Sequence, residues 1–385
     1  MCSLNSANLT AQHPYFYTIN DEDGLPSNEV YQVLQDDFGY IWIGCDAGLY
    51  RYDGFQFKHY YNSQQNGRAI SFLQLDGNQQ VWCKNFYGQL YRVEGDSLSL
   101  QYSEATSKPE KPQYTIDENN VCWLVDATHL IALKKNGTEQ ETLKLASLGI
   151  TNEVIALKYH ASNIYLLTNE LELFTYESTH KKMVKTDWVN KPSNTSQSAK
   201  IFTHQGVVYL LLSFENKISN LYRLKNSQLQ LVYSIPQIDN NFRVYDTYSD
   251  KNHIWIATSH GAFQMINDST LSNCYFPNKK ISTLFKDREG QYWFTNLHEG
   301  IHVVPNIEVI VYNSANSQLG ENNINVIKSI DNQDAWIGSS LGNLYRLQHE
   351  KKEIRAQYAN ETENFINVKA IKHYKNYLII SRGRF

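Results

Sequence analysis

The sequence predicts an all-β protein, a seven-bladed β-propeller of four-stranded antiparallel blades followed by the first blades of a second propeller. Short apolar runs, rich in aromatic and β-branched residues and separated by turns that contain Asp or Gly, predict strands. A strand that carries a tryptophan or a tyrosine recurs about every 40 residues, and its neighbouring strands recur with it. A period of about 40 residues with four strands per unit is typical of propeller blades.

The first blade is the clearest unit of the repeat. Each of its apolar runs is too short for a helix, and the last run follows Asp53-Gly54, which is a strong signal for a hairpin turn. The four runs occupy residues 30–34, 40–43, 49–52 and 55–60. Residues 15–19 precede the first run and resemble the fourth, so we expect them to form an outer strand.

The second strand of each unit carries a large aromatic residue. The tryptophans of this set are Trp42, Trp82, Trp123, Trp255, Trp293 and Trp336. Tyr165 and Tyr209 fill the long gap between the third and the fourth of them, and Tyr377 lies in a ninth unit. One twisted sheet cannot bury both of its faces alone, so we expect these side chains to fill the space between neighbouring blades.

The order of the strands predicts how the ring closes. Seven units take the chain to about residue 306, where the strand at 15–19 can pair with the third strand of the seventh unit, around 300–304. This pairing hides two sheet edges that would otherwise be exposed. An eight-bladed ring is the alternative, because propellers of that size occur.

A division of the chain follows from this closure. Residues 1–12 are expected to be a remnant of a signal peptide or a disordered lead, although they lack the basic and the apolar region of a signal. Residues 13–307 are expected to form the seven-bladed propeller. Residues 308–385 are expected to be the incomplete start of a second propeller, with 308–312 as its outer strand and with a ninth unit that stops one strand short.

Composition excludes several classes of function. The net charge of −4 and the absence of a long like-charged run leave no basic field for nucleic acid. No apolar run approaches the roughly 20 residues that span a bilayer, so none of these residues is expected to cross a membrane. The five cysteines form no C-x-x-C pair and are expected to be buried and unpaired.

Two patterns resemble catalytic or metal sites, and both have a structural explanation. Residues 298–302 match the H-E-x-x-H zinc motif, but they fall between two predicted strands, whereas the motif requires a helix. We therefore expect no metal and no cofactor. Acidic residues follow several inner strands, at Asp36, Asp76, Asp117 and Asp287. Aspartates at this position accept hydrogen bonds from the backbone two residues further on and fix the turn.

Loops on one face of the propeller are the expected place for a ligand. Loops from the outer to the inner strand and from the second to the third strand share this face, around the mouth of the central channel. The candidate ligand-binding residues are Asp46, Asn85, Phe86, Tyr87, His260, Asn296 and His298. The same face is expected to present His129, Asn169, Glu215, Asn216 and Ser339. Phe86 and Tyr87, beside polar groups, are suited to stack on a sugar ring.

The repeat resembles a known family. Residues 24–28, 41–44 and 48–54 resemble the two-component regulator propeller repeat, which occurs in sensor proteins of Bacteroidetes-type bacteria. Residues 287–301 resemble the repeat that closes the first of that family's two seven-bladed propellers. The resemblance is specific in units one, seven and eight. Units three to five keep the rhythm of the strands but lose the Tyr-Asp-Gly turn.

The resemblance implies a function. Such propellers form, with a β-sandwich, the periplasmic sensor that a membrane helix links to a histidine kinase or to another output domain, so the resemblance implies contact with the membrane only through a C-terminal part that is missing here. Small glycans are the ligand class that the resemblance implies, and a homodimer of the whole sensor is compatible with it. No nucleophile elbow or phosphate loop is present, which favours binding over catalysis. A propeller lyase or hydrolase at the channel mouth and a protein-interaction scaffold are the alternatives.

Overall fold

The computed structural model describes most of the chain. The described residues are 14–103, 112–134, 138–193, 196–214, 218–236, 238–267, 270–272, 274–314, 317–330, 334–348, 353–358, 367–375 and 377–383. The chain divides into two compact units. One comprises Phe16–Ile307, and the other comprises Glu308–Phe385 together with Pro14 and Tyr15.

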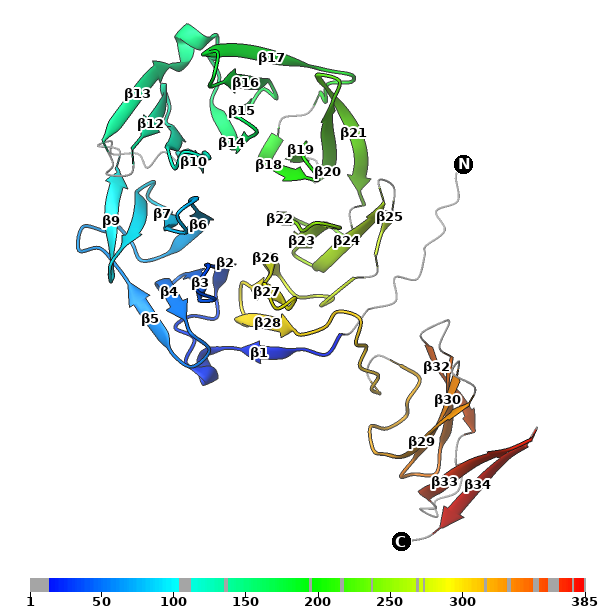
Figure 1. Ribbon diagram of the computed structural model, residues 1–385. Coiled ribbons are helices and arrows are strands. Elements are labelled where there is room, and N and C mark those ends of the chain that lie inside the picture. Colours follow the sequence, from blue (N-terminus) through cyan, green and yellow to red (C-terminus); the bar gives the residue numbers. More distant parts are fainter. Residues whose placement is uncertain are drawn as a thin grey trace. The chain divides into compact units, whose positions relative to one another are not determined.

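The first unit is a ring of seven four-stranded antiparallel blades, two of which are joined in one eight-stranded sheet, and the predicted propeller fold is confirmed (Figure 1). Blade 1 contains β2 (Val30–Gln35), β3 (Ile41–Cys45), β4 (Gly48–Tyr52) and β5 (Phe57–Tyr60). Blade 2 contains β6 (Ile70–Leu75), β7 (Val81–Asn85), β8 (Leu90–Glu94) and β9 (Ser97–Tyr102). Blade 3 contains β10 (Gln113–Ile116), β11 (Cys122–Val125), β12 (His129–Leu133) and β13 (Glu139–Lys144). Blade 4 contains β14 (Val154–His160), β15 (Asn163–Thr168), β16 (Leu173–Glu177) and β17 (Lys182–Trp188).

The remaining blades follow the same order of strands. Blade 5 contains β18 (Ser196–His204), β19 (Val207–Phe214), β20 (Ser219–Lys225) and β21 (Gln228–Ile235). Blade 6 contains β22 (Val244–Ser249), β23 (Ile254–Thr258), β24 (Gly261–Asn267) and β25 (Thr270–Leu271). Blade 7 contains β26 (Ile281–Lys286), β27 (Tyr292–Asn296), β28 (Ile301–Val304) and β1 (Tyr17–Ile19). Two short 3₁₀ helices, η1 (Asp21–Asp23) and η2 (Leu145–Leu148), lie in loops between blades.

The innermost strands β2, β6, β10, β14, β18, β22 and β26 contact one another in sequence, and β26 contacts β2. They therefore surround a central channel. The outer strands of blades 4 and 5 are also joined, because β17 and β21 pair in parallel over two residues. No helix among the described residues is long and apolar enough to cross a membrane.

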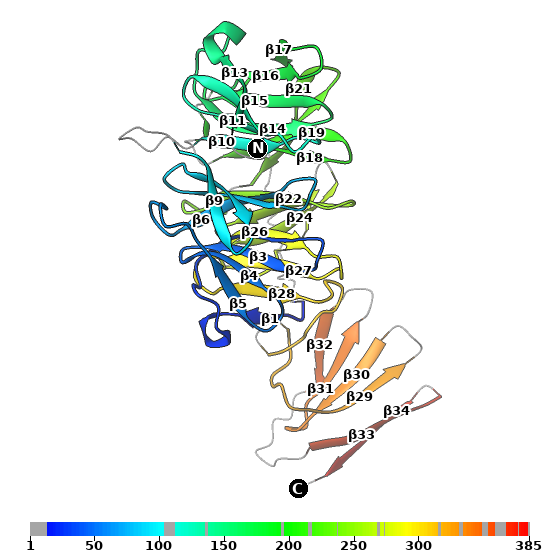
Figure 2. The ribbon, with the colours of Figure 1, turned by 60° about the vertical axis from the view of Figure 1, so that its left-hand side comes forward.

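The ring closes as the sequence predicts, through the N-terminal strand. β1 pairs antiparallel with β28, and the two strands lie side by side in both views (Figures 1 and 2). At Gly300 a Cβ atom would come within 2.3 Å of the carbonyl oxygen of Ile19, and φ is +82°, so only glycine fits at this approach. Thr18 Oγ1 and His302 Nδ1 add a hydrogen bond of 3.0 Å across the seam.

A repeated hydrogen bond fixes the turn between the inner and the second strand. Asp36 Oδ1 accepts from the backbone N–H groups of Phe38 and Tyr40, as the turn prediction requires. Asp36 Oδ2 also accepts from the indole Nε1 of Trp42 at 2.7 Å, which the sequence analysis did not foresee. The same indole bond joins Asp76 to Trp82, Asp117 to Trp123 and Asp287 to Trp293, each over six residues.

Blade 6 departs from this pattern. Asp250 lies five residues before Trp255 instead of six. Its Oδ1 accepts from the backbone of Asn252 and His253, but its Oδ2 accepts from the hydroxyl of Tyr292 in blade 7, at 2.9 Å. One missing residue in the turn thus redirects the carboxylate from its own blade to the next.

The recurring aromatic side chains pack between neighbouring units as predicted, including the half-buried Trp336, which packs against a cluster that contains Val368 and Ile371 of the ninth unit. Trp82 and Trp255 are fully buried, and Trp42 contributes to a core cluster that joins blades 1 and 2. Cys45, Cys83, Cys122 and Cys274 are buried free thiols, as predicted, and the fifth cysteine, Cys2, lies outside the described residues. Tyr377 is an exception: it begins a strand, but it is 71 % exposed, so the prediction of a packing role is wrong for this residue.

The second unit contains one complete four-stranded sheet and a hairpin. The sheet consists of β29 (Ile324–Ile330), β30 (Asp334–Ser339), β31 (Leu344–Gln348) and β32 (Glu353–Tyr358), and the hairpin of β33 (Asn367–Tyr374) and β34 (Tyr377–Gly383). The run at 308–312, predicted as an outer strand, forms no strand here, and within it Ile310 makes an isolated bridge to Pro14.

His302 predicts that the closure weakens in acid. Burial, more than any neighbouring charge, lowers the pKa of His302 from 6.5 to about 4, so the unfolded chain binds the proton more readily. Stability is fully present above about pH 6.5 and is lost as the pH falls towards 4, by about 3 kcal/mol at most. Urea unfolding of His302→Gln should show a smaller loss across this window than the wild type. His180→Gln, at an exposed position, is the control, and equal losses in all three proteins would contradict the account.

Trp82→Phe should destabilise the protein more than Trp255→Phe does. Both side chains are fully buried at the same strand position, but only Trp82 donates to an aspartate of its own turn. Loss of the indole leaves a buried carboxylate oxygen without its partner, which costs about 1–3 kcal/mol beyond the lost packing. Equal changes in the free energy of unfolding would show that the indole bond contributes nothing.

Candidate ligand-binding site at the central channel

In blades 1, 6 and 7, the two kinds of loop that were predicted to share a face lie against each other. In blade 1 the N–H of Asp46 donates to the carbonyl of Glu29, which lies just before the inner strand. In blade 6, His260 Nε2 bonds to Asp239 Oδ2 at 2.9 Å. In blade 7 the N–H of Leu297 donates to the carbonyl of Lys280. The second-to-third turn of each of these blades is therefore held against the segment that leads into its inner strand.

Asn85 and Asn296 build their turns and do not present themselves to a ligand. Each is 1 % exposed. Asn85 Oδ1 accepts from the N–H groups of Tyr87 and Gln89, and Asn296 Oδ1 accepts from that of His298 at 2.7 Å. Because both side chains are buried and bonded to the backbone of their own turns, they shape the turns and do not contact a ligand directly.

The histidines of the face have protein partners. His260 Nδ1 lies 2.8 Å from Ser259 Oγ, so both of its ring nitrogens are occupied. His298 is exposed, and its Nε2 lies 3.0 Å from Lys280 Nζ. His302, the second histidine of the zinc-like motif, is buried in β28, whereas His298 lies in the preceding turn. The described residues hold no group of three or more His, Cys, Asp or Glu that could bind a metal ion.

Aromatic residues gather where blades 1 and 2 meet. Phe86 packs edge-on against Tyr31 of β2, with 5.1 Å between ring centroids. Tyr31 donates to Glu29 Oε1 at 3.0 Å, and burial, this bond and the charge of Asp46 raise the pKa of its phenol. Phe86 and Tyr87 are 42 % and 56 % exposed. The predicted residues Asp46 and Phe86 thus come together around Tyr31, which the sequence analysis missed.

A β-bulge near the start of the inner strands explains why Tyr31 was missed. The register shifts at this place in β2, β6, β14, β18, β22 and β26. A bulge redirects a side chain out of the regular alternation. The bulged residues Tyr31, Phe72, Tyr245 and Ser282 all line the channel. Phe72 has a φ of 53°, a left-handed conformation that is strained for a bulky residue and is common at functional sites.

A spacing of three between buried residues was the available signal for these bulges. Val30 and Val33 are both buried, and so are Ile70 and Leu73 in the next blade. A regular strand buries residues two apart, so a spacing of three indicates one extra residue.

The channel contains a cavity of about 790 Å³ that is lined by residues of all seven blades. One lining residue from each blade, in order, is Gln32, Phe72, Thr115, Lys158, Lys200, Asp246 and Ser282. A cavity of about 1060 Å³ lies elsewhere, beside His129 and the loop from Lys144 to Val154. That cavity belongs to one junction between blades, whereas the channel is shared by every blade.

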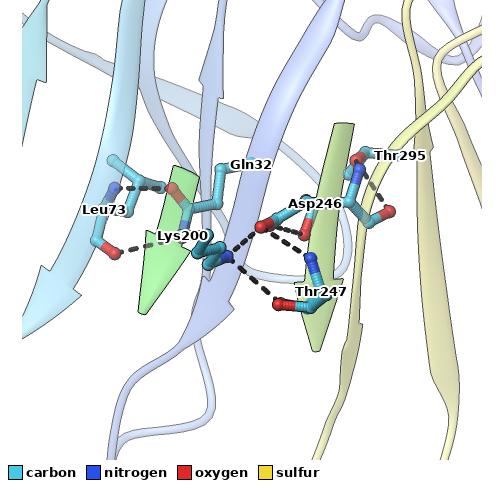
Figure 3. A network of polar contacts seen from close by, with 7 residues as sticks. Gln32, Leu73, Lys200, Asp246, Thr247 and Thr295 are labelled. Carbon is cyan, nitrogen blue, oxygen red and sulfur yellow. Dashed lines mark hydrogen bonds and ion pairs between the residues drawn. The ribbon is translucent and has the colours of Figure 1, made fainter. Parts of the chain in front are cut away.

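Side-chain bonds connect neighbouring inner strands around the channel (Figure 3). Gln32 holds the backbone of Leu73, accepting from its N–H at 2.8 Å and donating to its carbonyl at 3.1 Å. Asp246 forms an ion pair with Lys200 and accepts from Thr283 Oγ1 at 2.7 Å. Lys200 also donates to the carbonyl of Thr247 at 3.1 Å. Three blades, 5, 6 and 7, are therefore linked through one carboxylate.

The electrostatics of the channel are unusual for the interior of a protein. Burial, and next the positive charge of Lys158, lower the pKa of Lys200, whereas its ion pair with Asp246 favours the charged form. Burial also lowers the pKa of Lys158. A concave, partly apolar space with a few converging polar groups is the usual form of a small-molecule site. The arrangement is suited to binding an oxygen-rich molecule.

Comparison with known proteins supports the resemblance drawn from the motifs. Residues 24–47 match the family model described as the two component regulator propeller. A stretch of 71 residues is 34% identical to Histidine kinase P4 of Formosa agariphila and covers 18% of this chain and 5% of that protein. The chain therefore spans a small part of the curated relative that it matches.

Solved structures share the fold at low sequence identity. Two are extracellular domains of putative hybrid two component systems from B. thetaiotaomicron, with TM-scores of 0.58 and 0.61 at 18% and 15% identity. Each match covers 96% of this chain, and 51% and 58% of the respective solved chains. A streptogramin B lyase structure matches with a TM-score of 0.59 at 13% identity over 76% of this chain and 96% of its own.

Gln32→Ala should loosen the bulge at Leu73. The substitution removes both bonds to the Leu73 backbone and should lower the free energy of unfolding by about 1–2 kcal/mol. Hydrogen exchange of the Leu73 amide should become faster. Gln74→Ala is the matched control, because Gln74 makes a single long bond of 3.4 Å to the carbonyl of Tyr114. An unchanged exchange rate at Leu73 would show that the two hydrogen bonds from Gln32 do not stabilise the bulge.

Proposed function

We propose that the chain is part of the extracytoplasmic ligand-sensing region of a two-component signalling protein. The propeller would bind a small glycan at the mouth of the channel, without catalysis. The observation that carries this proposal is the cavity shared by all seven blades, with bulge-directed aromatic side chains at its rim. The repeat match at residues 24–47 and the likeness to extracellular domains of two component systems support the sensor role.

The chemistry of the rim suits a sugar. Phe86 and Tyr87 are exposed aromatic side chains, and Asp46 is an exposed carboxylate in the adjacent turn. Aromatic rings bury the apolar face of a sugar, while carboxylate and amide groups bond to its hydroxyls. Phe72 and Tyr245, 49 % and 40 % exposed, extend this surface around the channel.

Signal transfer requires that the ligand bind two arrangements of the protein with different affinity. A ligand in the channel would contact several blades at once, so its affinity would depend on how the linking side chains hold the inner strands relative to one another. Relay to an output domain, and pairing of two whole sensors, are parts of the proposal that concern the longer protein.

The surroundings of the two candidate catalytic histidines, His260 and His298, favour ligand binding over catalysis. Both ring nitrogens of His260 are occupied, and His298 lies in a different blade beside Lys280. An enzyme at the channel mouth remains the alternative, as the lyase fold match illustrates. If a ligand that binds is also converted, and if His260→Ala with His298→Ala abolishes its turnover, the enzyme reading replaces the sensor.

Titration calorimetry of the full chain against a panel of neutral and acidic oligosaccharides tests the proposal. A binder should lose about 10-fold or more in affinity in the variant Phe86→Ala with Tyr87→Ala, because stacking area is lost. Phe38→Ala and Phe55→Ala are the matched controls, since these residues are 84% and 94% exposed but lie in the turns that follow β2 and β4. The absence of any glycan binder, or equal losses in the controls, would contradict the glycan site.

A further inference from the structure

Lys158 is an unusual residue for its place in the propeller. It lies in β14 opposite Tyr165, the recurring aromatic of blade 4. Residues at the same place in the other blades are uncharged: Leu34, Gln74, Thr115, Phe202, Tyr248 and Phe285. An ammonium group in this layer carries a cost of desolvation that the other blades avoid.

Lys158 has no anionic partner among the described residues. Lys200, on the next inner strand, and Lys84, in blade 2, have protein partners instead. Lys200 pairs with Asp246, and Lys84 donates to the carbonyl of Pro112 and lies over the ring of Phe72. No hydrogen bond or ion pair of Lys158 joins it to a described residue, and burial alone lowers its pKa.

The cavity therefore carries an excess of positive charge. Its charged lining residues, within the described part of the chain, are Lys158, Lys200 and Asp246. Asp246 is already engaged by Lys200 and by Thr283. The charge of Lys158 also acts on Lys200 and disfavours its protonated form. Two cations that repel each other beside one engaged carboxylate would be stabilised by a bound anion.

We propose that Lys158, with Lys200 beside it, binds the anionic group of the ligand that enters the channel. This inference rests on the proposed function and narrows the ligand to an acidic sugar, with a carboxylate or sulfate group. The same cavity is lined by Tyr31 and Phe86 at the rim and by Lys158. The sugar ring would lie on the aromatic side chains, and its anionic group would reach the lysines. Ser198, on the next inner strand, lines the same cavity and offers a hydroxyl donor.

Calorimetry of the full chain with galacturonate oligomers, the matching neutral galactose oligomers and inorganic sulfate tests this site. Wild-type protein should bind the acidic oligomers at least 10-fold more tightly than the neutral ones, with an affinity that falls as salt is added. Lys158→Met should abolish this preference and leave the weak binding of the neutral oligomers unchanged. Lys182→Met, at an exposed position of the outer strand β17, should behave as the wild type.

Thermal unfolding of the ligand-free proteins gives a second readout. Lys158→Met should unfold at a temperature no lower than that of the wild type, because the half-buried ammonium makes no hydrogen bond or ion pair with a described residue that the substitution would remove. Thus a loss of binding in this variant cannot be attributed to misfolding. Equal binding of acidic oligomers to the wild type and to Lys158→Met would overturn the inference.

The outcomes separate this inference from the proposed function. Binding of neutral oligomers without any preference for acidic ones would overturn the anion site and leave the glycan sensor intact. Binding of sulfate alone, with no oligomer bound, would overturn the acidic-sugar ligand. Failure of every probe to bind would overturn both.

Discussion

The pairing of β1 with β28 is the constraint on which the rest of the first unit depends. A ring of seven blades has a single seam, and this seam joins strands that lie about 280 residues apart in the sequence. The backbone of Ile19 lies so close to Gly300 that no side chain fits at position 300. His302 is held neutral because it is buried between Thr18 and the ring of Phe276. Because the seam holds β26 against β2, it also sets the circumference of the channel and the approach of every inner strand to the next.

Within that frame, the blades repeat one local device. An aspartate after the inner strand closes its turn and accepts from the indole of the second strand, so the tryptophan that fills the space between blades is fixed in orientation. Blades 4 and 5 carry tyrosine at this place, and there the structure adds the parallel pairing of β17 with β21. The turn after the inner strand of blade 6 is one residue shorter, and its aspartate, Asp250, accepts instead from the hydroxyl of Tyr292 in blade 7. Each departure from the repeat is accompanied by a contact that joins adjacent blades.

The sequence predicts much of this fold because short local patterns, the turns and the spacing of aromatic residues, specify the repeat. Period, strand order, closure at 300–304 and the role of Asp36 follow from turn chemistry and from the spacing of aromatic residues. The channel was harder to predict, because bulges set which residues face it, and Tyr31 breaks the alternation that strand analysis assumes. Asn85 was misjudged for a related reason, since a polar residue in a turn can serve the turn alone. Lys158 lies in an otherwise apolar strand, and its position in the channel could not be predicted without knowing which inner strands are its neighbours.

These features combine in the proposed mechanism: the seam holds the inner strands, the bulges direct aromatic side chains to the channel, and the channel would receive the ligand. Native-state hydrogen exchange of the full chain tests its basis most directly. Amides of β1 and β28 should open with the same free energy as those of β3, because the seam can separate only when the first unit unfolds as a whole. Exchange of β1 at a far lower free energy, while β28 and β3 stay protected, would contradict a closed ring and with it the fixed channel.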